Sequence, residues 1–362
     1  MKTYKIAPLD MEAARKGLES WLSKESGKKN AFRVEREHGS KENLLSEIVG
    51  EIASRTLTFR PIRRGERIEP TNGKVRVIGV ESVKQQVCDH IACVALEPLL
   101  NAKVGFYQVA SVKGKGQSMC RRVLKKWVGD ARYHVKLDVR KCYQSTSHEV
   151  VMRILKKYVK GDDILYLCSA LLSTYRQGLE IGSHFSLRIM QLVLSFAYHE
   201  VEGMGKLRRG RWKSLVCHQI WYMDDILLIG TDKRDLRVAT RRLEKYMRDE
   251  LGLALKPWKI AKTSRAEPFD LGGWVVSVGR CSLRGATFLR AMRALRKFVR
   301  ASSPKNAKSF MAYWGWIANG NCERLRIDRG IDKAKAHAVR VISFQDRLES
   351  RCRLHQTPSS AG

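Results

Sequence analysis

The sequence predicts an α+β domain, in which antiparallel strands pack against helices, and three observations support this prediction. Segments 133–139 and 219–229 have the composition and alternation of strands. Longer segments with helical periodicity lie between and after them. Strands and helices follow one another in a mixed order, and 44% apolar residues are enough to build a core.

The first third of the chain is expected to form an arm, a hairpin and two helices. Residues 1 to about 30 are polar and loosely patterned, which predicts an N-terminal helix or arm. The later elements are a hairpin framed by turns at 60–61 and 69–73 with its second strand at 74–80, a helix from Val83 that stops near Pro98, a glycine- and lysine-rich connection at 105–116, and a basic helix at 119–128.

The middle of the chain is expected to hold the central strands. Strand 133–139 contains Asp138, and hairpin 219–229 is apolar on both sides of Asp224-Asp225. Helices are expected at roughly 147–158, 162–176, 184–203 and 233–251, followed by further strands up to Leu283.

The last eighty residues are expected to be helical and are strongly basic. Residues 284–353 contain 17 Lys or Arg but only 5 Asp or Glu. One helix should bury the apolar stripe Phe288, Met292, Leu295 and Val299. Its opposite face carries Arg290, Arg293, Lys297 and Arg300. A merely solvated face would normally include acids, and none occurs between Gly285 and Arg300, so we favour contact with nucleic-acid phosphates.

The overall charge indicates a polyanionic partner. Lys and Arg number 69 against 36 Asp and Glu, giving a net charge of +33, for which nucleic acid is the usual partner. An anionic membrane surface is the alternative, but the basic excess is spread along the chain, and no stretch resembles a bilayer span or a signal peptide. Nine cysteines without a CxxC pair indicate reduced thiols in the cytoplasm, rather than a disulfide framework or a zinc site.

Three acids carry the main chemical hypothesis. Phosphoryl transfer onto a nucleic-acid end uses two divalent cations about 4 Å apart, and such hard cations take oxygen ligands. Asp224 and Asp225 at a hairpin tip, facing Asp138 at a strand end, could supply these oxygens. The alternative is a solvated Asp-Asp turn. The apolar flanks disfavour it, because buried adjacent acids need a neutralising partner.

These residues resemble the motifs of reverse transcriptases. Tyr222-Met223-Asp224-Asp225 resembles the YxDD box, and Lys136 to Tyr143 resembles the first catalytic motif, an Asp followed five residues later by an aromatic. Further segments resemble family motifs in the family's order: Lys74–Ile78 (a fingers strand), Gly178–Ser183 (the templating motif), Leu253–Lys259 (motif D) and Leu271–Trp274 (the primer grip). The resemblance covers roughly residues 45–320, and the ordered set is far more specific than any single motif.

The resemblance implies a right-hand polymerase fold with fingers, an antiparallel palm and a helical basic thumb. The implied boundaries are an N-terminal helical arm at 1–44, fingers at 45–132, palm at 133–283 with a finger insertion at about 147–180, thumb at 284–345, and a basic polar tail at 346–362. The implied reaction copies template RNA into cDNA from a DNA or RNA primer and dNTPs. It uses two Mg²⁺ ions, for which Mn²⁺ can substitute.

The resemblance also implies roles for single residues. The metal ligands would be Asp138, Asp224, the carbonyl of Val139 and, more weakly or indirectly, Asp225. Lys259 would protonate pyrophosphate, with Lys256 as an alternative in the same segment. Nucleotide binding would involve Lys74, Arg76, Ile181, Gly182 and Tyr143, whose ring would exclude a ribose 2′-hydroxyl. Primer and template contacts would come from Tyr222, Met223, Gly272, Gly273, Trp274 and the basic face of the helix at 285–300. As alternatives, Tyr143 is a core aromatic, and Lys74 and Arg76 are exposed strand charges.

Three biological roles stay open. Glu180-Ile181-Gly182 stands where most of these enzymes have Pro-Gln-Gly, and the aliphatic residue resembles reverse transcriptases of diversity-generating retroelements, which miscopy adenines. The second role is an antiphage defence-associated or retron-type enzyme with a dedicated non-coding RNA. The third is an inactive basic RNA-binding scaffold, which the presence of all three acids disfavours. An accessory protein of the retroelement could be a partner, and no membrane partner is expected.

Overall fold

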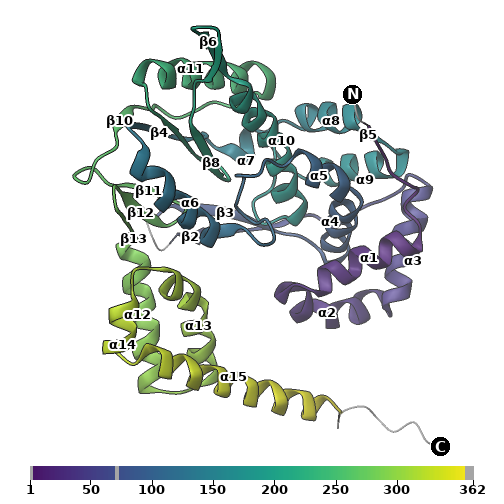
Figure 1. Cartoon of the computed structure of the whole chain (residues 1–362). Coiled ribbons are helices and arrows are strands. Elements are labelled where there is room, and N and C mark those ends of the chain that lie inside the picture. Colours follow the sequence, from purple (N-terminus) through teal and green to yellow (C-terminus); the bar gives the residue numbers. More distant parts are fainter. Residues whose placement is uncertain (1–2, 70–72, 355–362) are drawn as a thin grey trace, which may run out of the picture. The chain divides into compact units, whose positions relative to one another are not determined.

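The computed structural model describes residues 3–69 and 73–354 (Figure 1). The chain divides into two compact units. Unit 1 comprises residues 1–112 and 132–261, and unit 2 comprises 113–131 and 262–362. Both units contain helices and antiparallel strands, so the α+β prediction is confirmed. Within the described residues, no helix is both long and apolar enough to cross a membrane.

Unit 1 is built on a four-stranded sheet with the order β10-β4-β9-β8. Its strands are β4 (Tyr133–Asp138), β8 (His218–Tyr222), β9 (Asp225–Gly230) and β10 (Ile260–Lys262). Both β4 and β8 pair antiparallel with β9. Helix α11 (Lys233–Leu251) packs on β4 and β9, so the apolar run from Ile226 to Ile229 is buried.

Two long apolar helices of unit 1 are buried along most of their length. Helix α4 (Val83–Ala95) packs against α10 (His184–Gly203) and also against α1. The other helices are α1 (Met11–Leu22), α2 (Glu25–His38), α3 (Lys41–Ala53), α5 (Glu97–Lys103), α7 (Cys142–Ser145), α8 (His148–Tyr158) and α9 (Asp162–Ser173). Pro98 does not end the helical region, as we had expected. It lies in the first turn of α5, where proline's missing N–H has no intrahelical acceptor to lose.

Unit 1 also contains three small strand pairs. The expected hairpin is formed by β2 (Arg63–Ile68) and β3 (Val75–Val80), and part of its turn, 70–72, lies outside the described residues. A second hairpin, β6 (Gly205–Arg208) and β7 (Arg211–Ser214), was not expected. Strands β1 (Tyr4–Lys5) and β5 (Val159–Lys160) form a short parallel pair.

Unit 2 combines a three-stranded antiparallel sheet with helices. The sheet has the order β11-β12-β13, and α6 packs on β12 and β13. The elements are α6 (Gly116–Asp130), β11 (Phe269–Leu271), β12 (Trp274–Ser277), β13 (Arg280–Leu283), α12 (Gly285–Arg300), α13 (Pro304–Asn319), α14 (Glu323–Asp328) and α15 (Ile331–Leu354). Helix α15 continues through 346–354 of the expected tail, and 355–362 lie outside the described residues. The compact units therefore place α6 and β11–β13 with the C-terminal helices, and the names fingers, palm and thumb stay predictions.

Helix α12 buries a different face from the expected one. Its buried residues include Leu295 and Phe298, and the Phe298 ring stacks on Phe310 with ring centroids 6.0 Å apart. Val299 is 66% exposed, so the predicted stripe is wrong. The face that is buried is rotated about the helix axis from the face that we expected. The stripe residues instead line an open groove of about 370 Å³ beside Leu325. This difference arises because α13 and α15 pack on the Phe298 side.

Candidate active site

Strands β4 and β9 bring the three acids together at one end of the sheet of unit 1. Asp138, the last residue of β4, lies directly opposite Asp225, the first residue of β9. Asp224 precedes Asp225 in the turn between β8 and β9, and its carbonyl accepts a 3.3 Å hydrogen bond from the Val139 amide. Acids far apart in the sequence thus meet where the hypothesis requires them.

The backbone next to the acids is strained. Tyr222 pairs with Asp225, which leaves Met223 and Asp224 as a two-residue turn. Met223 has a φ of +56°, and Lys141, which follows Asp138 closely, has a φ of +45°. Each non-glycine residue in this region costs roughly 1 kcal/mol or more, and such residues concentrate at functional sites. The pairing of Tyr222 with Asp225 holds Asp224 at the tip of this turn and imposes the strain.

Two lysines accompany two of the acids. The Nζ of Lys256 lies 2.7 Å from Asp138 Oδ1, and the Nζ of Lys136 lies 3.3 Å from Asp225 Oδ1. Lys136 and Asp138 are two residues apart on one strand and so share a face, a signal that our sequence reasoning did not use. Of the two lysines offered by the motif-D segment, Lys256 contacts the acids, whereas Lys259 is exposed. The proton-donor role of Lys259 stays a prediction.

Negative charge is crowded around Asp224. Burial raises the pKa of Asp224 above its ordinary value, and the charges of Asp225 and Asp138 raise it further. Arg76 is near enough to lower this pKa, which places the hairpin β2–β3 within electrostatic reach of the acids. A bound cation would relieve the same repulsion.

The oxygens of this site fit a divalent cation chemically, although they are not gathered for one. Within residues 3–69 and 73–354, no three His, Cys, Asp or Glu side chains are already close enough to hold a metal ion. Asp138 Oδ1 is buried without a well-aligned hydrogen bond, even though the Lys256 ammonium is close. Carboxylate oxygens are suitable ligands for Mg²⁺ or Mn²⁺, and these oxygens would become available to a cation if the lysine side chains moved away.

The nucleotide-binding candidates lie around one turn. The Leu179 amide donates to the Tyr143 carbonyl at 2.8 Å, and the Gly79 amide donates to the Ile181 carbonyl at 2.9 Å. The turn 178–182 therefore joins the steric-gate candidate to β3. Burial raises the pKa of Tyr143, and the charges of Cys142 and Asp224 raise it further, so this side chain lies within electrostatic reach of Asp224.

The hairpin β2–β3 displays more arginines than the sequence reasoning considered. Arg67 lies directly opposite Arg76, so both side chains project from the same face. The Nε of Arg76 lies 3.1 Å from Glu69 Oε2, and the side chain of Arg76 is 52% exposed. Lys74 is exposed just before β3 begins. The basic residues spaced along 63–67 were the signal that could have identified Arg67.

A second basic site, the Glu37 arginine cluster, was also missed. We define it as Arg33, Arg36, Arg60 and Arg63 around a hollow of about 470 Å³ that Glu37 also lines. Glu37 accepts from Arg33 and Arg36 at 3.1 Å each, and from Arg60 at 3.2 Å. One carboxylate orients three guanidinium groups, and each keeps further N–H donors for an anion. No sequence pattern brings these residues together, because the chain returns to α2 only in the tertiary structure.

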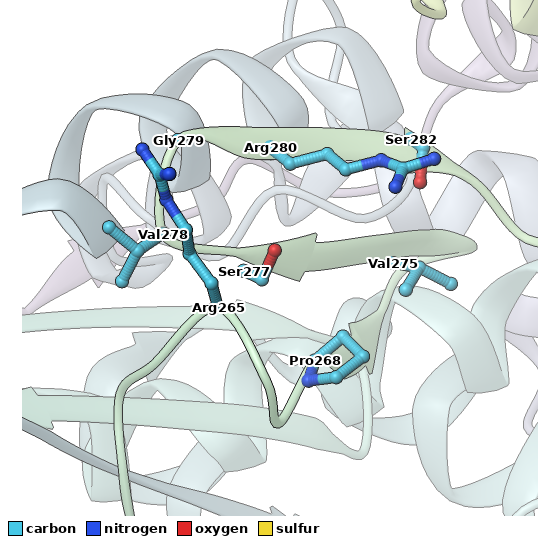
Figure 2. Close-up of a pocket in the computed structure, with 8 residues that line it drawn as sticks. All are labelled: Arg265, Pro268, Val275, Ser277, Val278, Gly279, Arg280 and Ser282. Atoms are coloured by element: carbon cyan, nitrogen blue, oxygen red, sulfur yellow. The ribbon is translucent and has the colours of Figure 1, made fainter.

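The primer-grip candidates of unit 2 lie in a hairpin turn. Gly272 and Gly273 both have positive φ values between β11 and β12. The Trp274 side chain is 1% exposed, packs at a tilt against Trp316 with ring centroids 5.3 Å apart, and donates to the Gln117 carbonyl at 3.1 Å. It therefore supports the turn from within unit 2. A groove of about 500 Å³ lies on this sheet. Figure 2 shows its lining, with Arg265 beside Gly279 and Arg280 extending toward Ser282. On α12, Arg293, Lys297 and Arg300 are exposed, and Arg290 is partly buried.

An antiparallel sheet that carries a two-acid turn against a third acid is the arrangement that the resemblance to template-directed polymerases implied. Comparison with known proteins gives the family. Residues 66–276 match the family model "Reverse transcriptase (RNA-dependent DNA polymerase)". The chain therefore belongs to the reverse transcriptase family, with the right-hand polymerase type of α+β fold that the motifs implied.

Individual relatives are distant. A Saccharomyces cerevisiae protein named for intron 1 of COX1/OXI3 is 20% identical over 169 residues, which are 44% of this chain and 20% of that protein. Among solved structures, apo telomerase from Candida tropicalis is 12% identical with a TM-score of 0.48, over 88% of this chain and 64% of that one. Telomerase from Candida albicans, in complex with a TWJ fragment of telomeric RNA, is 12% identical with a TM-score of 0.47, over 82% and 63%. The chain thus spans only about a fifth of its curated relative.

Proposed function

We propose that this protein is an RNA-directed DNA polymerase that extends a primer along an RNA template. Family membership supports this, and the observation that carries it is Asp138 lying opposite Asp225, beside Asp224. Two divalent cations held by these acids would activate the primer's 3′-hydroxyl and neutralise the departing pyrophosphate. Arg76 and Arg67 bind the triphosphate of the incoming nucleotide, and Tyr143 excludes a ribose 2′-hydroxyl. Lys256 or Lys259 protonates pyrophosphate.

Primer extension tests the proposal. Purified protein is given an RNA template, an annealed DNA primer, dNTPs and Mg²⁺, and the product is measured on a gel. Asp224→Asn keeps the size of the side chain and removes its charge, so we expect extension to fall by about a hundredfold or more. Asp249→Asn, which alters an exposed acid of α11 paired with Arg248, should retain activity. Equal extension by wild type and Asp224→Asn would leave an RNA-binding scaffold as the better description.

For the biological role, we infer a mutagenic reverse transcriptase of a diversity-generating retroelement. The support is Ile181, an aliphatic residue in the turn that carries the nucleotide candidates, whose carbonyl accepts a hydrogen bond from the Gly79 amide. An aliphatic side chain cannot form a hydrogen bond with the nascent base pair, so one contact that could favour the correct pair is missing. Sequencing the cDNA made from a defined RNA tests this role. Faithful copying at adenines would contradict a mutagenic enzyme. A single structured RNA that co-purifies would then favour the defence or retron role.

The location that we infer is the cytoplasm. Eight cysteines of the described residues are free thiols, and all but Cys217 are buried, which suits a reducing compartment.

A further inference from the structure

Glu180 is the charged residue of the templating motif, and the proposed reaction assigns it no role. It stands where the family usually has proline. Its side chain is only 10% exposed, and its Oε2 lies 2.6 Å from Arg64 Nη2. Arg64 is itself 19% exposed, so this ion pair is largely withdrawn from water. Burying two charges is costly even when they pair, so stability alone is a poor reason for this arrangement.

The ion pair joins two elements that also touch through their backbones. The Gly79 amide of β3 donates to the Ile181 carbonyl at 2.9 Å. A Cβ on Gly79 would come within 2.5 Å of Glu180 Cγ, and a Cβ on Gly182 within 2.6 Å of the Gly79 carbonyl oxygen. Only glycine at both places permits this approach, so the turn lies tightly against the edge of β3.

Strand alternation separates this contact from the nucleotide-binding face of the hairpin. Arg64 lies opposite Gly79, whereas Arg67 lies opposite Arg76. Because successive side chains of a strand point to opposite faces, Arg64 holds the hairpin from one face and leaves Arg67 and Arg76 on the other. On its other side the same turn is fixed to the Tyr143 carbonyl through the Leu179 amide.

We propose that Glu180 is a positioning residue of the nucleotide site, which uses its ion pair with Arg64 to hold hairpin β2–β3 against the turn 178–182. The pair sets the angle at which Arg76 and Arg67 face the acids. The Gly79 contact alone would let the hairpin pivot about a single backbone hydrogen bond. This inference rests on the proposed polymerase function, because the ligand of the positioned arginines is the triphosphate of the incoming nucleotide.

Steady-state primer extension with a varied dNTP concentration tests the positioning role. We expect Glu180→Gln and Arg64→Gln each to raise KM for the dNTP by about tenfold and to change kcat much less, because the hairpin binds the nucleotide and does not react. The double variant should have the same KM as either single variant, since each single change already removes the same ion pair. The exchange Glu180→Arg with Arg64→Glu should recover part of the loss. Glu66→Gln, which removes an exposed charge from the same hairpin, should leave KM unchanged.

Hydrogen exchange of the unliganded protein provides a readout that needs no activity. Peptides covering β3 should exchange faster in Glu180→Gln than in wild type, while peptides covering β8 and β9 should not change. An unchanged KM in Glu180→Gln, or multiplying effects of the two single variants, would overturn the positioning role, even if β3 exchanged faster. Inactive wild-type protein would count against the polymerase proposal, and the exchange of β3 would still test the contact itself.

Discussion

At the residue scale, the ammonium groups of Lys256 and Lys136 lie beside two of the acids that the proposed cations would need. Lys256 contacts Asp138 and Lys136 contacts Asp225. Such an arrangement lets the site fold without concentrated, unbalanced charge. It also implies competition between lysine and metal for the same oxygens.

Lys256→Met is expected to make the protein more dependent on Mg²⁺ for stability. Loss of this partly exposed ion pair should lower the metal-free stability by about 0.5–1 kcal/mol, and it frees Asp138 for the cation. Thermal unfolding in EDTA and in Mg²⁺ measures both effects. Lys259→Met is the matched control, since Lys259 is exposed in the same segment. Equal Mg²⁺ shifts in the two variants would speak against the competition.

A second pair of acids, Glu81 and Asp89, is buried near the residues that follow the turn 178–182. Glu81 and Asp89 are 4% and 0% exposed, and Asp89 accepts from the Ser183 hydroxyl at 2.7 Å and from the Phe185 amide at 3.0 Å. Burial raises the pKa of Glu81 to about 9, and the charge of Asp89 contributes further. The Glu81 carboxyl, which also lies near Gln85 and the Tyr175 hydroxyl, therefore keeps its proton and shares it with Asp89.

Glu81→Gln is expected to alter how stability depends on pH. The folded-state pKa of Glu81 is raised, so its contribution is complete below about pH 4.5 and is lost as pH rises toward about 9. Glutamine keeps a donor for Asp89 but cannot ionise. The variant should match wild type at pH 5 and exceed it at pH 8.5, by at most about 1.4 kcal/mol for each pH unit crossed. Urea unfolding at pH 5, 7 and 8.5 tests this, and a difference that is constant with pH would refute it.

At the scale of elements, helix α12 of unit 2 shows how neighbouring elements select the buried face of a helix. In α12 two apolar arcs lie side by side, and both contain large side chains. The Phe298 arc is buried against α13 and α15, while the arc that contains Val299 lines an open groove.

Phe298→Ala is therefore expected to destabilise unit 2 far more than Val299→Ala. Removing a buried ring that stacks on Phe310 should cost about 3–5 kcal/mol, because it leaves a cavity. Truncating the exposed Val299 should change the free energy of unfolding by less than about 0.5 kcal/mol. Chemical denaturation of both variants compares them directly. Similar costs would mean that the stripe expected from the sequence is the buried one after all.

At the scale of the whole molecule, the net charge of +33 predicts that RNA binding weakens steeply with salt. The basic sites described here occur in both units: the Glu37 arginine cluster in unit 1, and the Arg265–Arg280 groove and α12 in unit 2. We therefore expect phosphate contacts to be distributed along the chain.

The triple variant Arg36→Gln, Arg60→Gln, Arg63→Gln tests the Glu37 arginine cluster. Loss of three phosphate contacts should lower the slope of log affinity against log salt by about 2 for single-stranded RNA. The matched control replaces Arg208, Arg209 and Arg211 of the β6–β7 hairpin, which are equally exposed, by glutamine. Fluorescence anisotropy at several salt concentrations gives the slopes. If both triple variants lose the same slope, the cluster is no more than general surface charge.

The sequence by itself predicted the α+β class, the central strands, the hairpin that carries Arg76 and the three acids that the fold brings together. These features rest on local patterns: the alternation of strands, the periodicity of helices, and motifs whose order along the chain is specific. The short turn at Met223-Asp224 sets the register of β8 against β9, and burial of the apolar side chains of β4 and β9 restricts the register that places Asp138 opposite Asp225.

Only the tertiary structure decided which lysine meets the acids, which face of α12 is buried, and that Glu180 pairs with Arg64. Each of these depends on residues that are distant in the sequence, and local pattern leaves two or more nearly equal choices. The choice is made by the elements that pack alongside, because burial and ion pairing are properties of the neighbours that a folded chain brings together.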